Sequence, residues 1–147
     1  MSFDLSTLPT SACVGSAKLM LKLTGTQYVP RTFAVHRIVQ SWSEGTGGTN
    51  TGVTWNRRDG ITTWTKAGGD FAGTPTASVG TGTINGATLQ WNVTADVAAF
   101  RSGTAPNYGW LIKDASEGFG SEFRFASRES ITVAIRPQLK VSFVPCP

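Results

Sequence analysis

The sequence predicts an all-β fold, a jelly-roll-like β-sandwich with one short helix. Charged residues make up only 15% of the 147-residue chain, against about 25% in typical domains, and 17 glycines accompany many Thr and Ser residues. Several segments alternate apolar and polar residues with the period of two that half-buried strands show. Gly-rich stretches at 45–48, 68–70, 80–86 and 118–120 separate them. We expect a single module over residues 1–147, since 39% hydrophobic residues suffice for a core.

The expected strands follow in chain order. In residues 18–23 the leucines face one way, and Lys18, Met20 and Lys22 face the other. Residues 32–39 are β-branched and apolar, with weaker alternation. Further strands are expected at 88–93, 109–113, 121–128 and 138–144. Their inward faces are predicted to carry Leu89, Trp91, Val93, Phe123, Phe125, Leu139, Val141 and Phe143.

Residues 94–100 predict the helix. Thr94 is a suitable N-cap residue and Asp96 places an acid in the first turn. Val97, Phe100 and Arg101 share one side, so we expect the helix to close one end of the sandwich.

The only cysteines are Cys13 and Cys146, near the two ends of the chain. If the first and last strands are neighbours, a disulfide between them would close a very long loop, worth about 4–5 kcal/mol in the chain-entropy model. The alternative is a pair of free thiols in an intracellular protein. We predict the bridge, which fits an extracellular location.

The net charge of +4 comes from 13 Lys and Arg against 9 Asp and Glu. It indicates a mildly basic surface, with a preference for polyanions such as acidic polysaccharide as the functional alternative. Nucleic acid is not expected, because the longest basic run is Arg57-Arg58. A membrane partner is not expected either, because no stretch approaches the roughly 20 apolar residues of a membrane span. With no signal peptide at its start, the chain is expected to be a piece of a larger extracellular protein.

Residues suited to catalysis are few, and no catalytic residue is predicted. His36, the single histidine, lies inside an expected strand. The carboxylate pairs whose spacing would suit a glycosidase are Asp114 with Glu117 and Glu122 with Glu129, but spacing alone is weak support. No cofactor or metal site is predicted. A structural calcium ion stays open, although no D-x-D-x-D loop is present.

Aromatic and basic residues gather beside the Gly-rich loops. An exposed tryptophan ring can cover a pyranose face while a neighbouring cation pairs with a sugar carboxylate. The candidate ligand-binding residues of this kind are Trp42, Trp55, Trp64, Arg57, Arg58 and Lys66. The alternative is that these rings pin loops to the core with cations stacked on them. Pinning is favoured for Trp42 and Trp55, and the two roles are evenly balanced for Trp64.

Arg124 and Arg128 form a second candidate group. They share the strand parity of Glu122, so the three are expected to form a polar stripe on the outward face of one sheet. A concave face would make the stripe a binding groove. The alternative is a row of exposed ion pairs, each worth under about 1 kcal/mol.

Four groups of short segments, taken together, cover nearly the whole chain. They are 3–9 with the strand 18–23, then 41–46 with 53–58, then 91–94 with 107–113, and last 125–130 with 136–139. The most specific pieces are W-S-E-G-T at 42–46, T-W-N at 54–56 and F-A-S-R-E at 125–129. In these segments the chain resembles the DNRLRE domain family, also described as an alginate-binding type of carbohydrate-binding module.

The resemblance implies an extracellular β-sandwich with a binding or spacer role rather than a reaction. The predicted function is therefore a non-catalytic carbohydrate-binding module for acidic polysaccharide such as alginate. The alternative is a structural or adhesive surface module that assembles through an open sheet edge. Family members normally carry a strand or two before the F-D-L-S segment at 3–6, so the resemblance also implies an open edge in this chain. A second copy or a strand-donating partner is expected there.

Overall fold

A computed structural model describes residues 1–9, 11–26, 29–46, 48–82, 86–117 and 122–146. Strands dominate, with one α-helix and one 3₁₀ turn, at Val133–Ile135. In chain order the elements are β1 (Cys13–Thr26), β2 (Thr32–Arg37), β3 (Ala77–Gly80), β4 (Thr88–Asn92), α1 (Thr94–Ser102), β5 (Trp110–Asp114), β6 (Phe123–Phe125) and β7 (Gln138–Val144).

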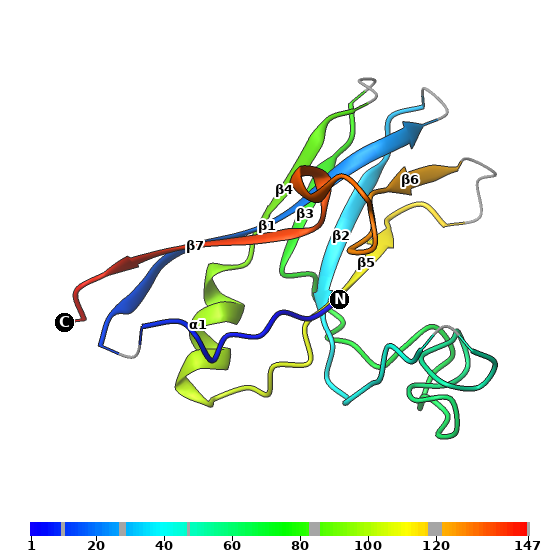
Figure 1. Cartoon of the computed structure of the whole chain (residues 1–147), viewed down its shortest axis with the longest axis horizontal. Coiled ribbons are helices and arrows are strands. Elements are labelled where there is room, and N and C mark those ends of the chain that lie inside the picture. The colour runs from blue at the N-terminus through cyan, green and yellow to red at the C-terminus, as the bar shows by residue number, and fades with distance from the viewer. Residues whose placement is uncertain (10, 27–28, 47, 83–85, 118–121, 147) are drawn as a thin grey trace.

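The strands form two antiparallel sheets (Figure 1), which confirms the predicted β-sandwich. In the first sheet β1 is central, with β4 on one side and β7 and β6 in succession along the other. In the second sheet β2 lies between β3 and β5. The other described strands of the first sheet therefore all pair with β1.

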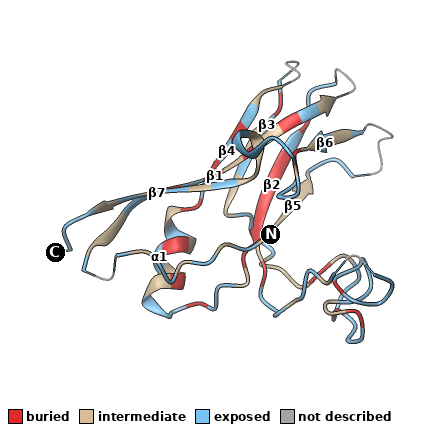
Figure 2. Ribbon diagram, in the orientation of Figure 1, coloured by how far each residue is buried: buried red, intermediate tan, exposed pale blue. Residues whose placement is uncertain are grey.

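The core lies between the sheets, as the alternation of apolar and polar residues predicts. Leu19 on β1 pairs with Trp91 on β4, and both are fully buried. Val35 on β2 is fully buried in the same cluster, and Figure 2 colours much of β2 as buried. The indole N–H of Trp91 donates to the Phe33 carbonyl at 2.8 Å, so it ties one sheet to the other.

Helix α1 packs against β1 and confirms the predicted helix, but Thr94 is not its N-cap. Val93 occupies that position. The Thr94 hydroxyl instead accepts the backbone N–H of Ala17 at 2.9 Å, because the first half of β1 lies directly beside the helix start. Val97 and Phe100 are buried, so the helix closes one end of the sandwich.

The disulfide between Cys13 and Cys146 is present, as predicted. It joins the start of β1 to the segment after β7, two positions that are 133 residues apart in the sequence. β1 and β7 are paired neighbours, so the bridge fastens the end of an existing strand pair. Among the described residues, no helix is long and apolar enough to span a membrane.

Two features differ from the expected pattern. Strand β3 is not among the predicted strands. Its four residues contain a single large apolar side chain, Val79, which is too little to give a recognisable pattern. β6 is shorter than the expected strand 121–128, of which residue 121 lies outside the described residues.

Between β2 and β3 the chain forms an irregular lobe, at the lower right of Figure 1, in which no strand is assigned to described residues. We call residues 41–72 the tryptophan lobe.

Candidate functional site

The tryptophan lobe is held together by turns rather than by strand ladders. The Ser43 N–H donates to the Arg58 carbonyl at 2.8 Å, and the Val53 N–H donates to the Ser43 carbonyl at 2.7 Å. Arg57 and Thr63 form an isolated antiparallel bridge. These bonds bring the residues around Trp42, Trp55 and Trp64 into one compact unit.

Trp55 is the exposed tryptophan of the lobe, with 66% of its surface accessible. Its ring lies so close to Gly68 that a Cβ atom at this position would stand only 2.8 Å from the ring atom Cη2. The Gly68 N–H donates to the Trp55 carbonyl at 2.7 Å. Gly68 also has a φ of +93°, which favours glycine. The glycine thus supports the ring from below and leaves much of it open to solvent.

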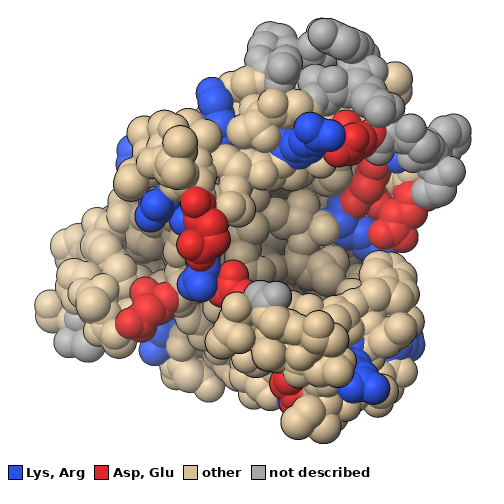
Figure 3. Space-filling view, turned by 45° about the vertical axis from the view of Figure 1, so that its right-hand side comes forward, with Lys and Arg blue, Asp and Glu red and all other residues tan. Residues whose placement is uncertain are grey.

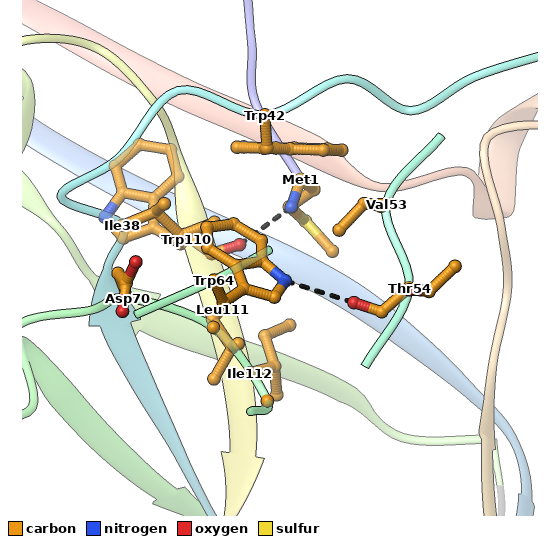
Figure 4. Close-up of a pocket in the computed structure, with 12 residues that line it drawn as sticks. Met1, Ile38, Trp42, Val53, Thr54, Trp64, Asp70, Trp110, Leu111 and Ile112 are labelled. Atoms are coloured by element: carbon orange, nitrogen blue, oxygen red, sulfur yellow. Dashed lines mark hydrogen bonds between the residues drawn. The ribbon is translucent and has the colours of Figure 1, made fainter. Parts of the chain in front are cut away.

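Trp42 and Trp64 take the pinning role instead. Trp64 is only 8% exposed, and its indole N–H donates to the Thr54 carbonyl at 3.1 Å. The indole N–H of the partly buried Trp42 donates to the Tyr108 carbonyl at 2.8 Å. Both rings line a cavity of about 240 Å³ that also contacts Val53 and residues 110–112 of β5 (Figure 4).

The two arginines of the lobe hold backbone carbonyls rather than carboxylates. Arg57 donates through Nη1 to the Gly60 carbonyl at 2.9 Å. Arg58 donates through Nη1 to the carbonyl and the hydroxyl of Ser41 at 2.9 and 2.7 Å. Within the described part of the chain, Arg57, Arg58 and Lys66 make no ion pair. Arg58 and Lys66 nevertheless act electrostatically on the nearby carboxylates of Asp59 and Asp70, whose pKa values they help to lower.

Arg124 and Arg128, by contrast, do not form the expected stripe. β6 ends at Phe125, so Arg128 lies beyond the strand and its parity no longer applies. The Arg124 Nε is 2.6 Å from Glu122 Oε1, and the Arg128 Nε is 2.8 Å from Glu129 Oε1. Figure 3 shows such basic and acidic side chains side by side around a hollow. These two arginines are already paired with carboxylates.

The single histidine occupies a structural position. His36 is buried in β2, and its Nδ1 is 2.8 Å from the Ala72 carbonyl oxygen. Its ring also stacks edge-on against Phe71, with 4.9 Å between the centroids. It therefore connects β2 to the end of the tryptophan lobe.

The carboxylates considered for catalysis are engaged in ion pairs. Asp114 Oδ2 is 2.7 Å from Arg31 Nη2. Burial opposes ionisation of Asp114, but the hydrogen bonds from Arg31 and Ser116 hold its pKa below the usual range. The hydrogen bond from Arg124 likewise lowers the pKa of Glu122. A glycosidase acid needs a raised pKa, so both shifts run in the opposite direction.

Groups of three or more metal-ligating side chains are absent from the described residues.

Asp70 stabilises the turn beneath the exposed ring. Its carboxylate accepts the backbone N–H of Thr65 at 2.9 Å and of Lys66 at 3.1 Å. The Thr65 hydrogen bond lowers the pKa of Asp70. A carboxyl whose folded pKa lies below its unfolded value, about 3.9, contributes stability above that pH. The contribution is lost as the pH falls through the lowered folded pKa.

We therefore expect the turn at 65–70 to loosen below about pH 4, before the sheets do. The amide proton of Thr65 should titrate by NMR with an apparent pKa below 3.9. Asp70→Asn should abolish this titration and leave the amide of Leu19 in β1 unaffected. A Thr65 amide shift that stays constant from pH 6 to pH 2 would contradict the assignment.

Sequence reasoning found the residue types of the lobe but missed what positions them. In the sequence Gly68 is one residue of a Gly-rich loop, and the Thr54 and Tyr108 carbonyls carry no sequence signal. The Gly68-Gly69 pair a short distance after Trp55 is the one available hint, since adjacent glycines permit close approach of a ring.

Comparison with known proteins gives one match. The model of carbohydrate-binding module family 96 (CBM96) matches residues 1–143. Searches of curated proteins and of solved structures found no match.

Proposed function

The chain belongs to carbohydrate-binding module family 96, and we propose that it binds an acidic polysaccharide, such as alginate, through the tryptophan lobe. The proposed binding is non-catalytic, in keeping with the ion-paired state of the carboxylates considered above. We further propose that it acts outside the cell. The Cys13–Cys146 disulfide supports this location, because disulfides persist in oxidising compartments.

The exposed ring of Trp55 is the observation that carries the proposal. A large aromatic ring that is 66% exposed leaves much apolar surface in water. The apolar face of a pyranose would remove that surface from water, which is favourable by about 25 cal/mol per Å². Gly68 holds the ring in place before any ligand arrives, so little ordering entropy remains to be lost.

The cations of the same lobe support the preference for acidic sugars. Arg57 and Lys66 are exposed and make no ion pair within the described residues. A guanidinium pairs with a carboxylate through parallel hydrogen bonds, which suits a uronate. Arg124 and Arg128 would first have to leave their carboxylate partners. We therefore place the acidic sugar at the lobe rather than on β6.

Trp55→Ala is expected to weaken alginate binding about tenfold or more, as the loss of an aromatic anchor does. Affinity electrophoresis in alginate-containing gels at low salt measures the effect as lost retardation. Ile61→Ala is the matched control, because Ile61 is an apolar side chain of the same lobe with 81% exposure. The control should be retarded like the unmodified protein, and circular dichroism should show intact sheets for both variants. An intact Trp55→Ala variant with full retardation would rule out the ring as the anchor.

A separate arm tests the sugar class. The double variant Arg57→Gln/Lys66→Gln should lose retardation by alginate, and added salt should reduce binding by the unmodified protein. Pectin should behave like alginate, and neutral glucans should retard the protein less. Equal retardation by a neutral glucan would contradict the acidic preference while leaving polysaccharide binding in place. No retardation in any of these gels would end the proposal.

A further inference from the structure

The outer face of the first sheet presents its side chains in cross-strand rows. Leu19 and Leu139 are paired and pack in the core, so the residues before and after them on β1 and β7 point outward. In the first outward row Lys18 on β1 lies opposite Lys140 on β7 and Asn92 on β4. The next two rows hold Gln90, Met20 and Gln138, and then Thr88 and Lys22. We call the residues of these rows the lysine face.

The cations of the lysine face have no acidic partner. Within the described residues, Lys18, Lys22 and Lys140 make no ion pair. Lys22 donates through Nζ to the Gly86 carbonyl. None of the nine Asp and Glu residues lies in the described strands β1, β4 and β7. The face is therefore basic, and no acid on it balances its charge.

The opposed pair of Lys18 and Lys140 is not favoured by folding alone. Side chains directly opposite in an antiparallel pair have Cβ atoms about 4.5–5.5 Å apart, and like charges in such a pair are destabilising. Both residues are exposed, so neither helps to fill the core. An anion bound over the two ammonium groups would replace this repulsion by attraction. The pair therefore indicates an anionic ligand.

The neutral residues of the face suit a sugar. Gln90 and Gln138 are exposed on either side of Met20, and their amides both donate and accept hydrogen bonds, as sugar hydroxyls do. The lysine face contains no aromatic residue. It therefore lacks the rings on which the bases of single-stranded nucleic acid stack.

A shallow hollow lies at one end of the face. Met20 and Lys22 line it together with residues 134–136, and its volume is about 80 Å³. Arg136 adds a further cation here and makes no ion pair within the described residues. Its Nε donates to the Ser130 carbonyl at 2.8 Å, which fixes the side chain at the rim. The basic surface thus extends from Lys140 to Arg136.

We propose that the lysine face is a second binding site for acidic polysaccharide, separate from the tryptophan lobe. Sugar carboxylates lie over Lys18 and Lys140, and sugar hydroxyls bond to the neighbouring amides. The ligand class rests on the proposed function, but this site depends on charge rather than on ring stacking. Exposed charge pairs are individually weak, so the face alone holds a short chain loosely. A long polysaccharide that reaches both sites gains affinity from the second attachment.

Met20 provides a direct probe of the face. The chain has two methionines, and Met20 lies in the middle row between Gln90 and Gln138. The full chain, with carbon-13 in its methionine methyl groups, is titrated at low salt with an alginate tetrasaccharide. We expect the Met20 methyl signal to shift in a saturable manner, and a neutral tetrasaccharide of glucose to leave it in place. An unchanged Met20 signal at millimolar alginate tetrasaccharide, or an equal shift with the neutral sugar, would overturn the proposal.

The double variant Lys18→Gln/Lys140→Gln tests the charge. We expect it to weaken tetrasaccharide binding, followed at Met20, about fivefold or more at low salt, because two exposed charge pairs are lost. The variant should fold with an equal or higher urea midpoint, because the two removed charges repel each other. A folded variant that binds as tightly as the unmodified protein would show that the opposed lysines do not hold the sugar.

A matched control separates the site from the net charge. Lys113→Gln/Arg124→Gln removes the same number of positive charges from residues that already pair with Glu117 and Glu122. It should change the affinity read at Met20 by less than about twofold. An equal loss in this control would assign the effect to overall charge and overturn the site.

The two sugar sites can be distinguished in the same titration. Trp55→Ala should leave the Met20 shift unchanged, and a Met20 shift that disappears in this variant would overturn the second site. If the indole signal of Trp55 stays in place while Met20 shifts, the tryptophan lobe fails and the lysine face stands. A single-stranded oligonucleotide that shifts Met20 at lower concentration than alginate would assign the face to nucleic acid and overturn the proposal.

Discussion

Replacement of Cys13 and Cys146 by serine is expected to lower the free energy of unfolding by about 4–5 kcal/mol. The disulfide joins residues 133 positions apart, so its loss gives the unfolded chain much more conformational freedom. A domain of this size is stable by only about 5–15 kcal/mol. The doubly substituted chain should therefore unfold at much lower denaturant concentration.

Urea titration followed by tryptophan fluorescence measures this loss. The unmodified protein under strong reductant is the control and should match the Cys13→Ser/Cys146→Ser variant. The folded sheets themselves should persist in water, because β7 pairs with β1 from one end of β7 to the other. A native disulfide typically contributes about 2–4 kcal/mol. A loss of less than about 1 kcal/mol would therefore show that the bridge hardly restricts the unfolded chain.

Trp91→Ala is expected to destabilise the fold by about 3–5 kcal/mol. Trp91 is fully buried, lies opposite Leu19 in the strand pairing and hydrogen-bonds Phe33 in the other sheet. Its removal leaves a cavity where the two sheets meet and breaks a bond between them. The loss should appear as a lower urea midpoint with a similar slope.

Trp55→Ala provides the matched comparison for the same residue type. Since Trp55 is mostly exposed, we expect its removal to change stability by less than about 1 kcal/mol. Similar losses for the two substitutions would show that the sandwich core is placed wrongly.

Alternation predicts the strands that have one face in the core. β1, β4 and β7 all follow from inward residues at every second position, and the structure buries Leu19, Leu21, Leu89 and Trp91 as expected. β3 escapes prediction because a four-residue edge strand needs few apolar side chains. The tryptophan lobe escapes it because turns leave no periodic signal.

The candidate site is predictable in residue type but not in exposure. Trp64 is the more balanced candidate for an exposed ring in the sequence, yet it is buried and Trp55 is open. The difference comes from partners that only tertiary structure supplies: the Thr54 carbonyl satisfies Trp64, and Gly68 supports Trp55. The expected stripe through Arg128 is wrong for a related reason, since strand parity ends where β6 ends.

The most direct test of sugar binding at the tryptophan lobe is an NMR titration of the indole N–H signals with an alginate oligosaccharide. The five tryptophans give five signals, and buried Trp91 and Trp110 serve as references. We expect the Trp55 signal to shift in a saturable manner while those of Trp91 and Trp110 stay in place. A Trp55 signal that does not move while the oligosaccharide binds elsewhere, or no response at all, would contradict the account.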